Sequence, residues 1–144
     1  EGLPLYITGH SLGAALATVA TQRLEHNPRI RETIAACYTF GSPRVGNSHY
    51  DIEFKSPIYR VVNTTDVVTV IPLLAMGYIH IGDVRFLGAK DGEFQRSIPF
   101  FRRWYLFALT MLKFFGPIVG DHAIVQYRRK LEAIADKRNP RFGH

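Results

Sequence analysis

The chain has 144 residues, which is long enough for one domain with a sizeable core, and 47% of them are hydrophobic. Lysine and arginine number 18 against 12 aspartates and glutamates, a net charge of +6, but no nucleic-acid-binding motif accompanies this excess and we expect no nucleic-acid partner. The single cysteine, Cys37, excludes an internal disulfide and a cysteine metal cluster.

The first half of the sequence alternates between strand-like and helix-like patterns. Branched and aromatic runs predict buried strands over 5–7, 34–40 and 58–62, with Cys37 inside the second. An Ala- and Leu-rich stretch predicts a helix over 12–24 that ends near Asn27-Pro28, and 48–54 is predicted to be a short helix. Strands that alternate with helices indicate right-handed crossovers and a mostly parallel sheet, so the predicted fold class is α/β.

The second half of the sequence predicts a hairpin, an apolar segment and a final helix. The hairpin covers 82–96 and turns at Asp91-Gly92. The final helix covers 122–137, with Asp121 as its N-cap. Its buried stripe is predicted to consist of Ile124, Tyr127, Leu131 and Ile134.

The stretch Gly9-His10-Ser11-Leu12-Gly13 fits the pattern G-x-S-x-G at the point where the first strand becomes a helix. A serine at such a corner is forced into an uncommon backbone conformation, and side chains at the two glycine positions would collide across the turn. The hydroxyl then sits at the positive end of a helix, which suits a nucleophile whose reaction passes through an oxyanion. Because a serine hydroxyl is a weak nucleophile, it needs a base and an acid that orients the base.

Reactive groups of parallel sheets gather at the carboxyl ends of the strands, and this rule selects the partners of Ser11. Asp66 stands just beyond the strand over 58–62 and is the expected acid, with Asp83 as its rival. His122 follows a loop and precedes a helix, so it is the expected base. His80 is predicted to be a packed structural histidine, and His10 is predicted to be structural or part of the cleft wall. The order Ser, Asp, His is the one expected of an α/β-hydrolase.

The chain resembles the class 3 (fungal-type) lipase family of α/β-hydrolases. The resemblance runs from Leu3 to about Leu131, the C-terminal part of such a domain. The stretches that carry it are Tyr6–Ala17, Tyr38–Asn47, Tyr59–Asp66 followed by Pro72, and Asp121-His122 leading to Tyr127. Because the serine comes so early in the chain, we expect 1–144 to be a partial domain that lacks N-terminal strands.

The resemblance implies a serine hydrolase that cleaves a lipid or small ester substrate without a metal or organic cofactor. Ser11 would be the nucleophile, His122 the base and Asp66 the acid, with the backbone N–H of Leu12 as one oxyanion donor. The family's second donor and its flap lie upstream of the strand that leads to Ser11, so we expect this chain to lack both. The alternative is a non-catalytic lipid-surface or interaction protein that keeps the fold.

The apolar segment 98–119 is an insertion relative to the family pattern. It carries Trp104, Phe107 and Phe114 beside Arg102, Arg103 and Lys113. These charges and Pro117 leave an apolar run that is too short to span a bilayer. Bulky aromatics flanked by cations are typical of a helix that lies in a membrane interface. A buried core helix is the alternative.

Overall fold

The structure is a computed structural model of the whole chain. It describes residues 2–52, 54–63, 66–72, 74–88, 94–95, 99, 101, 105, 108 and 122–139. The predicted Asp91-Gly92 turn, Asp121 and most of 98–119 lie outside these residues.

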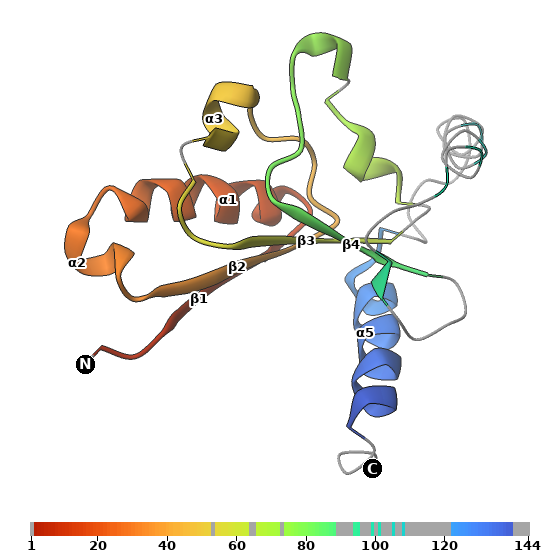
Figure 1. Cartoon of the computed structure of the whole chain (residues 1–144). Coiled ribbons are helices and arrows are strands. Elements are labelled where there is room, and N and C mark those ends of the chain that lie inside the picture. Colours follow the sequence, from red (N-terminus) through yellow and green to blue (C-terminus); the bar gives the residue numbers. More distant parts are fainter. Residues whose placement is uncertain are drawn as a thin grey trace.

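Within the described residues, a five-stranded sheet with the order β1-β2-β3-β4-β5 forms the centre of the molecule (Figure 1). β1 to β4 are parallel, and β5 pairs antiparallel with β4. The strands are β1 (Leu5–His10), β2 (Ile34–Phe40), β3 (Ile58–Asn63), β4 (Asp83–Leu87) and β5 (Phe94–Gln95). The predicted mostly parallel α/β sheet is thereby confirmed.

Helices lie on both faces of this sheet. Figure 1 shows α1 and α3 on one face and α5 on the other. The helices are α1 (Leu12–Glu25), α2 (Pro28–Arg31), α3 (Ser48–Ile52) and α5 (Ile124–Arg138), with short 3-10 turns η1 (Val67–Val70) and η2 (Leu74–Met76). No helix in the described part of the chain is long and apolar enough to cross a membrane.

Two apolar clusters form the core, one on each face. Ala17, Cys37, Ile58 and Ile81 pack on the α1 face, and Cys37 is fully buried as predicted. The other cluster packs α5 against the sheet and consists of Val61, Leu87, Tyr127 and Ile134.

Three expectations about these elements are wrong. Ile124 is 48% exposed and does not belong to the buried stripe of α5, because it is the first residue of the helix and the contact with the sheet begins only at Tyr127. α5 begins at Ile124 with Ala123 as its N-cap, so Asp121 does not cap it. β1 is not a buried strand, because Tyr6 is 61% exposed on the sheet face away from α1.

The predicted breaker Asn27-Pro28 ends α1 and also begins α2, a helix that the sequence analysis missed. The Asn27 side chain accepts a hydrogen bond from the Arg29 N–H at 3.1 Å, and Pro28 occupies the first helical position. Proline is favoured there because the missing N–H has no helical partner anyway.

The strand register brings three loops together at one edge of the sheet. His10 at the end of β1 lies opposite Phe40 at the end of β2, and Phe40 lies opposite Val61 of β3. Ser11, Gly41 and Asp66 follow these three strands, so they leave the sheet at neighbouring points.

Candidate active site

Ser11 occupies a strained corner between β1 and α1. Its φ of 58° and ψ of −127° make it the one non-glycine residue with positive φ in the described part of the chain. Such a conformation costs of order 1–3 kcal/mol and persists only where the surroundings enforce it. The Ser11 N–H donates to the Phe40 carbonyl at 3.0 Å, which fixes the corner against the end of β2.

The two glycines of the motif have different roles. A Cβ at Gly9 would lie 2.2 Å from the Gly13 carbonyl oxygen, so glycine is required there. A Cβ at Gly13 would meet no atom within 4 Å. The predicted collision at Gly13 is therefore wrong, because the crowding arises only from the Gly9 side, against the backbone of the first turn of α1.

Ser11, His122 and Asp66 are joined by hydrogen bonds. His122 Nε2 lies 2.7 Å from Ser11 Oγ, and His122 Nδ1 lies 3.0 Å from each carboxylate oxygen of Asp66. The Asp66 side chain is fully buried and that of His122 is 16% exposed. The structure thus brings together the serine, acid and base candidates, from segments separated by as many as 111 residues.

The partners of His122 determine where its protons lie. The Asp66 carboxylate only accepts hydrogen bonds, so Nδ1 of the neutral imidazole carries the proton. Nε2 then carries the free lone pair of the ring and accepts a hydrogen bond from the Ser11 hydroxyl. This arrangement can remove a proton from Ser11 while the carboxylate stabilises the resulting imidazolium.

Tyr127 of α5 holds the acid from behind. Its hydroxyl donates to Asp66 Oδ2 at 2.5 Å and accepts from the Asn63 N–H at 3.1 Å. Burial, followed by the charge of Asp66, raises the pKa of Tyr127 well above its ordinary value, so the hydroxyl stays protonated and donates. Lys130 extends this support by donating to Asn63 Oδ1 at 2.6 Å.

Gly41 faces the acid from the other side. Its φ is +57°, and a Cβ there would lie 2.6 Å from Asp66 Oδ2, 3.0 Å from the Tyr127 hydroxyl and 3.2 Å from His122 Nδ1. Only glycine leaves room for the carboxylate. Neither this contact nor that of Tyr127 was predicted from the sequence. The signals that could have indicated them are the position of Gly41 directly after a strand and the hydroxyl of Tyr127 on a helix face predicted to be buried.

His10 contacts the base rather than the serine. Its Nε2 lies 2.8 Å from the His122 carbonyl oxygen. Its ring stacks on the His122 ring with centroids 4.8 Å apart, and its edge faces Tyr127 at 5.9 Å. The prediction that His10 is structural or part of the cleft wall is therefore incomplete, because His10 also contacts the loop that carries His122.

The rival acid lies at the other end of the sheet, and the rival histidine precedes the same strand. Asp83 begins β4, at the amino ends of the parallel strands, and its exposed carboxylate pairs with Arg85 at 3.4 Å. His80 precedes β4. Burial, then Arg60 and Arg44, lowers the pKa of His80 to about 3, which makes it a poor base.

The expected oxyanion donor, Leu12, is the first residue of α1. The N–H groups of a first helical turn have no intrahelical acceptor, so this group is available to a ligand beside Ser11. Its role remains a prediction. Across the described residues, no group of three or more His, Cys, Asp or Glu side chains could hold a metal ion.

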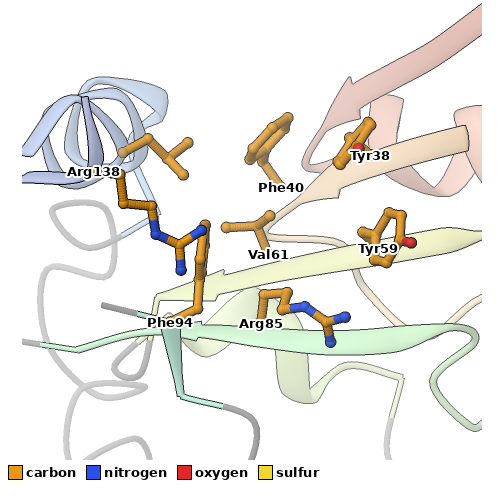
Figure 2. A pocket seen from close by; sticks show the side chains of 8 residues that line it. Tyr38, Phe40, Tyr59, Val61, Arg85, Phe94 and Arg138 are labelled. Carbon is orange, nitrogen blue, oxygen red and sulfur yellow. The ribbon is translucent and has the colours of Figure 1, made fainter. Parts of the chain in front are cut away.

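A separate groove of about 400 Å³ lies on the α5 face of the sheet (Figure 2). Its lining residues are Tyr38, Phe40, Tyr59, Val61, Arg85, Phe94, Leu131 and Arg138. The Tyr38 and Tyr59 rings stack at 5.3 Å, and the Arg85 and Arg138 guanidinium groups cover the Tyr59 and Phe94 rings. None of the three hydrogen-bonded candidates lines it, so this groove is not the space in front of Ser11.

The sequence profile of the family described as "Lipase (class 3)" matches residues 1–76, more than half of the chain. The chain belongs to this lipase family. The match includes Ser11 and Asp66, whereas the place of His122 rests on the geometry above.

Curated relatives support the same assignment. The chain is 40% identical over 79 residues to the secreted mono- and diacylglycerol lipase A of Penicillium cyclopium, which covers 54% of this chain and 25% of that protein. It is also 40% identical over 86 residues to the phospholipase A1-II 1 of Oryza sativa subsp. indica, covering 57% and 21%. The chain thus spans about a quarter or less of the length of these relatives.

Solved lipase structures have the same arrangement of elements. The lipase of Rhizopus microsporus var. chinensis matches with a TM-score of 0.58 and 30% identity, over 63% of this chain and 33% of that one. A structure described as "A serine protease triad forms the catalytic centre of a triacylglycerol lipase" matches with a TM-score of 0.55 and 30% identity, over 65% and 37%. The predicted α/β-hydrolase fold of a class 3 lipase is therefore confirmed.

Proposed function

We propose that this chain carries the catalytic centre of a serine hydrolase that cleaves carboxylic esters of lipids. The continuous hydrogen-bonded path from Ser11 Oγ through the His122 ring to Asp66 carries the proposal. Membership in the class 3 lipase family supports it. We propose further that residues 1–144 form part of one α/β-hydrolase domain.

The reaction follows from the proton positions. Ser11 Oγ attacks the ester carbonyl while His122 Nε2 takes its proton, and the Leu12 N–H stabilises the oxyanion that forms. His122 then gives the proton to the departing alcohol, which leaves an acyl group on Ser11. Water attacks this acyl carbon, its proton passes through His122 to Ser11 Oγ, and the carboxylic acid is released.

The substrate class is an acylglycerol or a phospholipid ester, as in the relatives named above. We propose that 98–119 contacts the lipid surface. The described positions 101, 105 and 108 are helical and exposed at spacings of four and three, and Phe101 and Tyr105 are 85% and 64% exposed. Exposed aromatic residues on one helical face suit a membrane interface.

Replacing Phe101 and Tyr105 by serine tests the lipid contact. Binding to anionic vesicles and hydrolysis of emulsified lipid should fall, whereas hydrolysis of a short soluble ester should not. Tyr6→Ser removes an equally exposed aromatic on the open sheet face and should change neither. Equal loss on both substrates would contradict a lipid-docking role.

Five substitutions in the full-length gene product test the catalytic assignment, and two of them, at His80 and Asp83, are controls. Ser11→Ala should abolish ester hydrolysis and fluorophosphonate labelling without unfolding the protein.

His122→Ala should lower the hydrolytic activity about as much as Ser11→Ala, because triad members act as a unit, whereas His80→Ala should lower it much less. Asp66→Asn should lower turnover strongly and Asp83→Asn should not. Equal labelling of the parent and Ser11→Ala would refute Ser11 as the nucleophile, whereas a parent that neither hydrolyses esters nor is labelled would favour the non-catalytic lipid-surface protein.

A further inference from the structure

His10 joins the nucleophile strand to the loop that carries the base. It is the last residue of β1 and directly precedes Ser11. His122 lies just outside α5, whose N-cap is Ala123, and the first bond of the helix runs from the Gln126 N–H to the Ala123 carbonyl. The His122 carbonyl is thus outside the helical ladder, and His10 Nε2 reaches it at 2.8 Å.

This contact fixes the chemical form of His10. A carbonyl oxygen only accepts hydrogen bonds, so Nε2 of His10 must carry a proton and donate. The same ring covers the face of the His122 imidazole, with 29° between the two planes. His10 therefore holds both the backbone and the ring plane of the base.

The importance of this support changes during the proposed reaction. In the free protein, the His122 ring has a partner on each nitrogen, Asp66 at Nδ1 and Ser11 at Nε2. Once Ser11 Oγ is acylated, it has no proton to donate, and the hydrogen bond to Nε2 is lost. The ring must nevertheless stay in place to activate water.

We propose that His10 is a positioning residue that holds His122 in its productive orientation through the acyl-enzyme stage. This inference rests on the proposed function. Its particular consequence is that His10 supports deacylation more than acylation, because Ser11 itself orients the base only before acylation.

The test compares variants that separate the two contacts in the full-length gene product. His10→Phe keeps the stacking surface and removes the donor, His10→Leu removes both, and His10→Gln restores an N–H donor. The matched control is His26→Phe, since Nδ1 of exposed His26 likewise lies 2.8 Å from a backbone carbonyl, that of Gln22, but far from Ser11 along the chain.

With a p-nitrophenyl ester, His10→Leu and His10→Phe should lower the steady-state kcat by about 10- to 100-fold, the cost of misplacing a catalytic group. The initial burst of p-nitrophenol should grow toward one per labelled Ser11, and the fluorophosphonate labelling rate should change little. His10→Gln should recover part of kcat, and His26→Phe should match the parent.

Two results would overturn the inference. One is unchanged kcat in all three His10 variants. The other is an equal fall of kcat, burst amplitude and labelled fraction in all three variants, including His10→Gln. Such a result would mean that His10 is needed for folding and does not position His122. If Ser11→Ala still hydrolyses the ester, the proposed function fails instead, so the two failures are distinguishable.

Discussion

Single residues around Asp66 leave its carboxylate no freedom. Tyr127 donates from one side, His122 from another, and the absent side chain of Gly41 leaves the remaining space. A buried carboxylate must be fully hydrogen-bonded to be tolerated, so each of these neighbours affects both stability and the base that Asp66 orients.

Gly41→Ala should displace the Asp66 carboxylate, because the new Cβ would lie 2.6 Å from Oδ2. We expect turnover to fall by about 100-fold, the effect of a misplacement near 1 Å. The matched control is Gly77→Ala, which also has positive φ but meets no atom within 4 Å. Both variants should lose about 1 kcal/mol of stability from backbone strain, measured by urea denaturation, but only Gly41→Ala should lose activity. Full turnover in Gly41→Ala would contradict this account.

Tyr127→Phe removes the hydroxyl that donates to Asp66 and accepts from Asn63. Two buried polar groups lose a partner, so the free energy of unfolding should fall by about 1–3 kcal/mol. Turnover should fall by about 10-fold, because the acid is less well positioned. Tyr38→Phe, on the exposed sheet face, should leave both measurements unchanged. Equal effects of the two substitutions would refute a supporting role for the Tyr127 hydroxyl.

Local sequence could select Ser11, Asp66 and His122 because each follows a recognisable boundary of a strand or precedes a helix. It could not predict the contacts of Asp66 with Gly41 and Tyr127, which are distant from it in sequence and meet it only in the folded chain, whereas the hydrogen bond from the Val68 N–H is local. It also gave the wrong reason for Gly13, because the direction of a missing Cβ depends on backbone geometry. His10 was placed near the site, but its contact with His122 bridges 112 residues.

At the scale of elements, α5 packs on the sheet through Tyr127 and Ile134, and its first residue, Ile124, lies outside this contact. Ile134 is 5% exposed and packs with Val61 and Leu87, whereas Ile124 is 48% exposed. Ile134→Ala should lower the free energy of unfolding by about 2–4 kcal/mol through the lost burial and the cavity. Ile124→Ala should change it by less than about 0.5 kcal/mol. Comparable losses in denaturant titrations would mean that Ile124 is buried in solution.

The predicted strand boundaries agree with the structure where β-branched and aromatic runs are bounded by turn residues. Strand 34–40 was predicted as observed, and β3 extends the prediction by Asn63. α2 was missed because four residues are too few for a helical period. The burial of β1 was overestimated because the residue pattern does not show what covers each sheet face.

Across the whole molecule, His80 should make stability depend on pH. Its folded-state pKa is about 3, whereas an unfolded histidine titrates near 6.5. Between these values the unfolded state binds the proton and the folded state does not, so stability is full above about pH 6.5 and falls as the pH decreases. Arg60 and Arg44 oppose a third positive charge and strengthen this effect.

Replacing His80 by glutamine should therefore reduce the pH dependence. Between pH 7 and pH 4.5, the variant should lose about 2.5 kcal/mol less stability than the parent. Thermal melting at several pH values measures the difference, and exposed His49→Gln serves as the control. If stability depended on pH identically in the parent and His80→Gln, protonation of His80 would not destabilise the folded state, and this account would be wrong.

The separation of 111 positions between Ser11 and His122 also has a consequence for the order in which the chain is made. During translation, β1, α1 and β2 emerge well before α5 is synthesised. Under the proposed function, a nascent chain at that stage contains Ser11 without the base His122, and a hydroxyl without a base is a weak nucleophile. On the proposed mechanism, Ser11 therefore does not attack esters while the chain is on the ribosome, until α5 packs on the sheet. The time at which Ser11 becomes reactive toward a fluorophosphonate should thus report when folding is complete.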